Sequence, residues 1–360
     1  MRLALVIALL IIMALPILAH AQGWYVAINS SQVSIVVAPT NSTYILNIIN
    51  ETRHCIYIEA YELTYQPLIN ELISLAKRDV TVYVVLSGNV YGGIPEDEYA
   101  AVSELRSAGV HVSFNYGFDY VHSKVFVIDN ETVIIGSINP TYYGFEHDLG
   151  IDLIIENSSI ASVFANIVLS DYRNASITQI NYPGIVISPI NSYEYLSDLL
   201  SQPGTLYMAL EELYPSSGLY GLIQEHSNRL ILVGSHGENY YAVNELGAVM
   251  INDLTAKAIV VGNYVYIGSI NLDYTSLHEN RELGIIIENP QVAHDVIAVI
   301  QQWHGESTTG ASQSMNTQNT QLTGNTNETL YLITLIILAL IIVASTSRGR
   351  RRARVIRDWY

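Results

Sequence analysis

The feature that most constrains the fold is an internal repeat in the middle of the 360-residue chain. The stretch VHSKVFVIDNETVIIGSIN, residues 121–139, is echoed by LTAKAIVVGNYVYIGSIN, residues 254–271. Upstream, IYIEAYELTY (56–65) matches LYMALEELYP (206–215). Self-similarity on this scale indicates that one structural unit is used twice, so both halves should share one fold.

Each half reads as short apolar strands alternating with helical segments. In the first half, CIYIEAY is typical of a buried strand, YQPLINELISLAKRD of an amphipathic helix, and VTVYVVLS of the next strand. Strands that alternate with helices predict an α/β layered domain with a largely parallel sheet. We therefore expect two α/β domains, residues 22–172 and 182–305, joined by a short linker.

Both ends of the chain differ from the middle. Residues 1–21 contain one arginine, an apolar run and an A-x-A site, the order of a cleaved signal peptide, with an uncleaved anchor as the alternative. Residues 306–328 are polar and nearly uncharged, as in a flexible stalk. Residues 329–346 form an apolar run followed by an arginine-rich tail, 347–360, which predicts one transmembrane helix with a cytoplasmic C-terminus. The pattern predicts an extracellular ectodomain anchored in the cell membrane.

The charge of this ectodomain argues against polyanionic partners. Between residues 22 and 328 the chain has nine lysine and arginine residues against 32 acidic residues, a net charge of about −23. Such a surface repels phosphate backbones, so we do not expect nucleic acid as a partner outside an acidic habitat. One cysteine, Cys55, excludes an intramolecular disulfide, and seven N-x-S/T sequons are typical of a glycosylated surface protein.

The first copy of the repeat gathers residues that suit an anionic substrate. His122 and Lys124 are two positions apart on a predicted strand, so both side chains leave the same face. Gly136 allows close backbone approach, while Ser137 and Asn139 offer small polar groups. A lysine neutralises negative charge, and hydroxyl and amide groups donate hydrogen bonds. The cluster therefore favours an anionic, tetrahedral ligand.

Lysine usage supports the same interpretation. The chain has three lysines, and two of them, Lys124 and Lys257, occupy equivalent positions in the two copies of the repeat. A protein that almost lacks lysine has it at both of these positions, which indicates a shared anion-binding role. Common descent of the two halves is the alternative explanation.

At these residues a family becomes recognisable. The pattern H-x-K-x4-D-x6-G-S-x-N, complete from His122 to Asn139 and partly duplicated, resembles the phospholipase D superfamily of phosphodiesterases and phosphatidyltransferases. The resemblance covers roughly residues 30–305. It implies two phospholipase D-like α/β domains packed face to face around one active site. It also implies catalysis without metal or cofactor, in which one histidine forms a covalent phosphohistidine and another protonates the leaving alcohol.

The resemblance assigns roles to individual residues. Matching HDLGIDLIIEN (147–157) to RELGIIIEN (281–289) pairs Asp148 with Glu282 as the acids that orient the histidines. The implied catalytic set is His122, Lys124, Asp129 and Asp148, with Asp148 orienting His122 and Asp129 structural. The implied substrate-binding residues are Ser137, Asn139, Lys257, Ser269, Asn271 and Glu282.

The second copy departs from the pattern. Thr255 stands at the histidine position, and one residue is missing where the aspartate belongs. Three replacements for the absent proton donor are open: Glu282 with a raised pKa, His147 or His278, or a second intact copy in a homodimer. Glu282 is slightly favoured by its position. The remaining histidines considered, His111, His226 and His236, are expected to be structural or solvated.

These features favour a membrane-anchored, extracellular phospholipase D-like phosphodiesterase. It would act on phospholipid or other phosphodiesters through a phosphohistidine at His122. One alternative is a catalytically inactive relative that binds phosphorylated ligands at the cell surface, because one of two histidines is absent. Another is an extracellular nuclease, which the net charge opposes.

Overall fold

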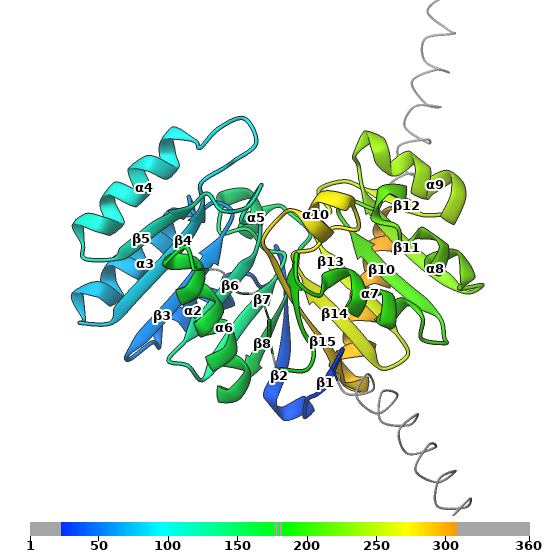
Figure 1. Cartoon of the computed structure of the whole chain (residues 1–360), viewed down its shortest axis with the longest axis horizontal. Helices are drawn as coiled ribbons and strands as arrows, with labels where there is room; N and C mark the ends of the chain where they lie inside the picture. Colours follow the sequence, from blue (N-terminus) through cyan, green and yellow to red (C-terminus); the bar gives the residue numbers. More distant parts are fainter. Residues whose placement is uncertain (1–22, 176, 178, 181, 308–360) are drawn as a thin grey trace, which may run out of the picture. The chain divides into compact units, whose positions relative to one another are not determined.

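Two β-sheets, one in each half of the repeat, organise the protein (Figure 1). The computed structural model describes residues 23–175, 177, 179–180 and 182–307. In the first half the elements are β2 (Val33–Val37), α2 (Tyr44–Asn50), β3 (Cys55–Ala60), α3 (Gln66–Lys77), β4 (Thr81–Ser87), α4 (Glu96–Ser107), β5 (His111–Asn115), β6 (Lys124–Ile128), β7 (Thr132–Gly136), α5 (Tyr142–Glu146), β8 (Ile151–Glu156) and α6 (Ser158–Tyr172).

The second half repeats this plan. Its elements are β9 (Ile185–Ser188), α7 (Ser192–Leu200), β10 (Leu206–Leu210), α8 (Tyr220–Glu225), β11 (Arg229–Gly234), the 3₁₀ turn η3 (Gly237–Asn239), α9 (Tyr240–Leu246), β12 (Val249–Ile251), β13 (Lys257–Val261), β14 (Tyr264–Gly268), α10 (Tyr274–His278) and β15 (Glu282–Glu288). A further helix begins at residue 290. The short strand β1 (Val26–Ala27) pairs with β15, so the start of the described chain joins the second sheet, which the sequence did not indicate.

Both sheets are mixed. The first runs β2-β8-β7-β6-β3-β4-β5 and the second β1-β15-β14-β13-β10-β11-β12, with β9 also on β15. Parallel pairing is confined in the first sheet to β3-β4-β5, and the other neighbours are antiparallel. The predicted α/β class is confirmed, but the largely parallel sheet is wrong. The turn at Asp129 and Asn130 joins β6 to β7 as a hairpin, and a hairpin makes antiparallel neighbours.

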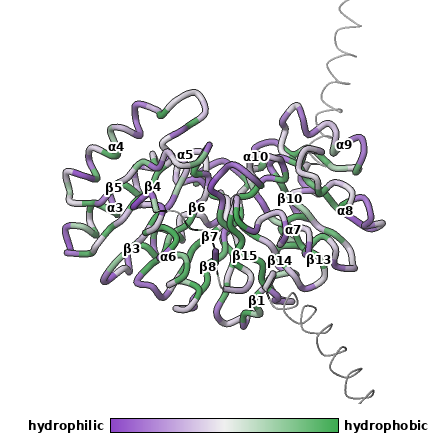
Figure 2. The backbone as a smooth tube through the Cα atoms, in the orientation of Figure 1, coloured by the Kyte–Doolittle hydropathy of each residue, from purple (hydrophilic) through white to green (hydrophobic). Residues whose placement is uncertain are grey.

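The two sheets share one apolar core. Strands β7 and β8 contact β14 and β15, and alternate residues of these strands point into the common layer. Val133 and Ile135 from the first sheet and Val265 and Ile285 from the second are fully buried there, together with residues of α6. Figure 2 shows that many residues of these strands are hydrophobic where the strands meet. The described residues up to His304 accordingly form one compact unit.

Two parallel bridges between the halves are related by the repeat. Val121 pairs with Arg281, and Leu254 pairs with Leu149. The residues that follow the first member of each pair are His122 and Thr255, the two positions of the motif histidine. The fold therefore holds both motif positions at the junction of the halves.

A buried ion pair lies beside the first of these bridges. The guanidinium of Arg281 places Nε 2.8 Å from Oδ2 of Asp171 on α6, and it donates to the carbonyl of Ser188 on β9 at 2.9 Å. It also covers the ring of Phe118, 4.3 Å from the centroid. Arg281 is 1% exposed, so its charge is compensated within the protein. This side chain joins the two halves.

The predicted targeting segments fall outside this description. The signal peptide (1–21), the membrane helix (329–346) and the basic tail (347–360) lie outside the described residues, as do residues 308–328 of the predicted stalk. Among the residues that the structure describes, no helix has both the length and the apolar character needed to cross a membrane.

Removing the buried cation should destabilise the protein strongly. We expect Arg281→Met to lower the free energy of unfolding by about 3–5 kcal/mol, because Asp171 is left as an unpaired buried carboxylate. Arg78→Met is the control: Arg78 is 46% exposed beside Glu71, and its loss should change stability by less than about 1 kcal/mol. Urea unfolding of the full chain, followed by circular dichroism, measures both. Equal, small effects would contradict this account.

Candidate active site

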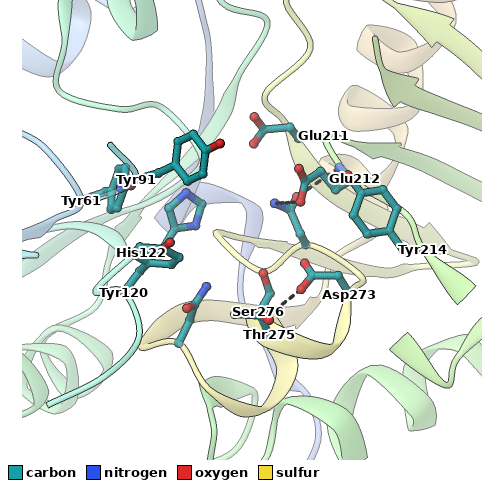
Figure 3. A pocket seen from close by; sticks show the side chains of 12 residues that line it. Tyr61, Tyr91, Tyr120, His122, Glu211, Glu212, Tyr214, Asp273, Thr275 and Ser276 are labelled. Atoms are coloured by element: carbon teal, nitrogen blue, oxygen red, sulfur yellow. Dashed lines mark hydrogen bonds between the residues drawn. The ribbon is translucent and has the colours of Figure 1, made fainter. Parts of the chain in front are cut away.

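A pocket of about 370 Å³ lies at the junction of the two halves. Figure 3 shows Tyr61, Tyr91, Tyr120 and His122 of the first half facing Glu211, Glu212, Tyr214 and Asp273 of the second. The sheets position part of the pocket wall. Tyr61 directly follows β3, and Glu211 and Glu212 directly follow β10, at the carboxyl ends of parallel strands, where ligand sites of α/β proteins are usually found.

His122 is held by a carboxylate from the other half. Its Nδ1 lies 3.0 and 3.2 Å from the two carboxylate oxygens of Glu282, and Asn280 donates to the same carboxylate at 3.0 Å. Glu282 is fully buried, whereas the His122 side chain remains 18% exposed to the pocket. A carboxylate at Nδ1 fixes the tautomer and leaves Nε2 as the nitrogen with a free lone pair.

The charges around this pair set its protonation. Burial lowers the pKa of His122, and it outweighs the neighbouring carboxylate of Glu282, which raises it. Burial raises the pKa of Glu282, but the His122 ring and its hydrogen bond hold it below the usual range. Neutral pH therefore leaves a neutral imidazole beside an ionised carboxylate. This is the state of a nitrogen nucleophile.

The structure places Glu282, and not Asp148, at the ring of His122. Asp148 lies half-buried near Glu211 and Asp253, and burial followed by these two charges raises its pKa. The expectation that Asp148 orients His122 is therefore wrong. The idea that Glu282 supplies the leaving-group proton is wrong as well, because this carboxylate is ionised and occupied by the histidine.

Strand register explains the misassignment. β8 pairs Asp152 with Gly136, which opens the first GSIN segment (136–139). β15 pairs Gly284 with Gly268, which opens the second GSIN segment (268–271). These two positions are therefore equivalent, and two residues earlier Gly150 occupies the place that Glu282 has in the second half. Matching Leu149-Gly150 with Leu283-Gly284 in the sequence therefore misaligns the two halves by two residues. The acid for a second histidine is thus absent along with the histidine.

The two lysines of the repeat converge beneath the pocket. Lys124 is fully buried and donates to the carbonyl of His122 at 2.6 Å. Burial, and then the charge of Lys257, lower the pKa of Lys124 to about 7. The positive charge of Lys257 is instead paired with a carboxylate, since its Nζ lies 2.5 Å from Oε2 of Glu211. Lys124 therefore carries the ammonium group of the two that is bonded to a carbonyl and not to a carboxylate.

The serines of the GSIN segments serve the sheet and not the pocket. Ser137 is fully buried, and its hydroxyl accepts from the backbone N–H of Ile151 at 3.0 Å and lies 3.2 Å from its carbonyl. Ser269 makes the same pair of bonds with Leu283. The expectation that these serines bind substrate is therefore not supported by their positions. Each hydroxyl ties two strands together.

The asparagines of the two segments also differ. Asn271 lines the pocket and accepts from the backbone N–H of Glu212 at 3.2 Å, so it positions the pocket wall. Asn139 is half-buried in the first half, and the Oδ1 atom of its amide is buried.

Asp129 has the structural position that the resemblance implied. Its carboxylate accepts from the backbone N–H groups of Arg53, His54 and Cys55 at 2.8–3.0 Å. Burial raises its pKa, but these hydrogen bonds outweigh burial and lower it. Asp129 thus fastens the β6-β7 turn to the start of β3.

Sequence reasoning missed Glu211. It follows β10, lines the pocket, and bonds Lys257, where the first half has Tyr61. The repeat itself held the signal, since Glu211 directly precedes Glu212, which aligns with Glu62. The candidate donors His147 and His278 are exposed, and each packs against tyrosine rings on its short helix.

Fold and site together define a class: a duplicated mixed α/β protein with a histidine-lined pocket between its halves. A family model described as "Cardiolipin synthase, PLD-like domain" matches residues 45–172 and 229–303, more than half of the chain. The chain therefore belongs to the phospholipase D superfamily.

Individual relatives are distant. A phospholipase D of Rickettsia conorii is 26% identical over 139 residues, which is 38% of this chain and 68% of that protein. A mitochondrial cardiolipin hydrolase of Xenopus laevis is 33% identical over 97 residues, 27% of this chain and 44% of the relative. Among solved structures, phosphatidylserine synthase of Haemophilus influenzae superposes with a TM-score of 0.59 at 14% identity, covering 78% of this chain and 87% of that one. Polyphosphate kinase of Porphyromonas gingivalis gives 0.58 at 12%, covering 75% and 50%. Both likenesses are of fold alone.

The titration of His122 tests the carboxylate assignment. We expect Glu282→Gln to lower the pKa of His122 further, because the negative charge that stabilises the protonated ring is lost. Asp148→Asn is the matched control and should leave that pKa unchanged. NMR titration of the histidine-labelled full chain, with His122→Ala to assign the signal, measures both. A larger shift in Asp148→Asn would reverse the assignment.

Proposed function

We propose that this protein is a phosphodiesterase that acts through a covalent phosphohistidine at His122. The observation that carries the proposal is the buried His122–Glu282 pair, which leaves Nε2 facing a pocket with Lys124 beneath it. A neutral imidazole supported by an ionised carboxylate is the usual way to make a histidine nucleophilic.

The first chemical step follows from this geometry. Nε2 of His122 attacks phosphorus, the N–P bond forms, and the bond from phosphorus to the leaving oxygen breaks. The imidazole ring then carries a positive charge, which the carboxylate of Glu282 stabilises through Nδ1–H. Lys124 compensates the negative charge on the phosphoryl oxygens. Water later breaks the N–P bond and restores the ring.

A phospholipid is the substrate class that we favour. The pocket combines tyrosine rings with the carboxylates of Glu211, Glu212 and Asp273, and this acidic wall opposes a polyanion such as DNA. The relatives named above include a phospholipase D and a cardiolipin hydrolase, whose names refer to phospholipids. These similarities support a lipid phosphodiester over a nucleic acid.

The proposed location rests on the sequence. The signal-like residues 1–21 and the apolar run 329–346 with its arginine-rich tail support an extracellular protein anchored by one C-terminal helix. Such a tether would keep the pocket close to its lipid substrate.

A second candidate function is a phosphate-binding surface protein without catalysis. The observation that favours it is the double loss in the other half-site, where Thr255 and Gly150 occupy the places of a histidine and its acid. The same experiment separates the two functions.

A covalent adduct on His122 is the decisive readout. The detergent-solubilised full chain, incubated with bis(p-nitrophenyl) phosphate and quenched in alkaline denaturant, should carry a p-nitrophenyl phosphoryl group on His122 by mass spectrometry. His122→Ala should show neither adduct nor product. Phosphatidylcholine vesicles and duplex DNA, tested in parallel, distinguish lipid from nucleic acid. A folded protein that binds inorganic phosphate but gives no adduct and no product would be the non-catalytic binder.

The pH dependence should reflect Lys124. Its charged form is present below a pKa of about 7 and is lost above it, so kcat/KM should fall as pH rises through about 7. On the acid side, the lowered pKa of His122 keeps the nucleophile neutral below the usual histidine range. A pH profile with bis(p-nitrophenyl) phosphate, whose leaving group needs no proton, isolates this effect. A profile that keeps rising above neutral pH would contradict it.

A further inference from the structure

The proposed reaction lacks a proton donor for the leaving oxygen. The other half-site has Thr255 at the histidine position and Gly150 at the position of its acid. An alkyl alcohol is a poor leaving group unless its oxygen is protonated as the bond breaks. Some other group at the pocket must therefore supply the proton.

Glu211 occupies the side of the pocket opposite His122 (Figure 3). Its side chain is 23% exposed, and its two oxygens have different partners. Oε2 lies 2.5 Å from Nζ of Lys257, and Oε1 lies 3.7 Å from Nε2 of His236. Glu211 thus connects a buried lysine to an imidazole.

The backbone fixes where this imidazole lies. His236 follows β11, the strand parallel to β10, so it and Glu211 leave the same edge of the sheet. The backbone N–H of His236 donates to the carbonyl of Gly234 at 2.8 Å. A Cβ on Gly234 would lie 2.9 Å from Cδ2 of His236, so the ring packs where a side chain at position 234 would be. With 47% of its side chain exposed, His236 remains open to a ligand.

We propose that His236, held by Glu211, is the general acid and base of this enzyme and replaces the absent histidine of the second motif. The inference rests on the proposed phosphodiesterase function. It gives the protein two histidine–glutamate pairs, His122 with Glu282 across the halves and His236 with Glu211 within the second half.

The charges agree with this assignment. The carboxylate of Glu211 beside the ring raises the pKa of His236 and outweighs its partial burial, which favours the protonated imidazole. Burial raises the pKa of Glu211, but Lys257 outweighs burial and holds it well below the usual range. Glu211 is therefore an ionised partner and not the donor. Glu212 and Lys257 are the other charged groups that act on His236.

Protons are balanced over the two steps of the reaction. When Nε2 of His122 bonds to phosphorus, the proton of the His236 imidazolium moves to the leaving oxygen, and an alcohol departs. In the second step neutral His236 takes a proton from water, whose oxygen attacks phosphorus while the N–P bond breaks. The products are an alcohol and a phosphomonoester, and both histidines return to their starting states.

The leaving group provides the test. With an alkyl phosphodiester, such as phosphatidylcholine in vesicles, we expect His236→Asn to reduce kcat/KM by about 100-fold or more, the usual range for general acid catalysis. With bis(p-nitrophenyl) phosphate the same variant should lose less than about tenfold, because p-nitrophenolate leaves unprotonated. His294→Asn, at a histidine whose side chain is 78% exposed, is the matched control and should match the wild type on both substrates.

Each contrary outcome has a distinct meaning. Equal losses on the two substrates would make His236 a structural residue, and no loss would exclude it; either result overturns the inference. Glu212 lines the pocket beside Glu211 and its pKa is raised by burial, so a selective loss in Glu212→Gln with none in His236→Asn would make Glu212 the donor. Retained activity in His122→Ala would instead refute the phosphohistidine route through His122, and no activity in the wild type on either substrate would refute the phosphodiesterase function itself.

Discussion

The site depends on two consecutive side chains at the start of β15. Arg281 reaches back to Asp171 on α6, while Glu282 turns to the ring of His122. Both partners belong to the first half, and all but the histidine are nearly or fully buried. Because an unpaired charge in such a place is costly, the two halves are held in the one arrangement that satisfies both. Structural stability and the orientation of His122 therefore share a single peptide segment.

The two copies of the repeat hold the backbone of their GSIN segments with different side chains. In the first half Asp152 accepts from the backbone N–H of Ile138 at 3.0 Å. In the second half the equivalent position is Gly284, and the hydroxyl of Tyr266 accepts from Ile270 at 3.1 Å. The ring of Tyr266 fills the space that a side chain at 284 would need. The GSIN segment is thus supported in both copies, although only the first retains the motif histidine.

Much of this could be predicted from the sequence, because a repeated motif and alternating strands and helices are local patterns. The class of fold, the family, His122 and the buried lysines follow from them. The carboxylate that pairs with His122 could not be predicted in this way. Matching the Leu-Gly pairs of the two halves aligns Asp148 with Glu282, and only the strand pairing shows that this alignment is off by two residues. Glu211 and His236 were missed for a related reason. They lie 25 positions apart in the chain, and parallel pairing of β10 with β11 brings them together.

The pairing of His122 with a carboxylate of the other half makes the chain resemble a dimer fused into one polypeptide, with one working histidine position at its pseudo-twofold junction. Because strands of both sheets pack in one apolar core at this junction, the halves cannot part without opening that core. The contact between His122 and Glu282 is therefore fixed by the same apolar packing that holds the protein folded, whatever the concentration of the protein.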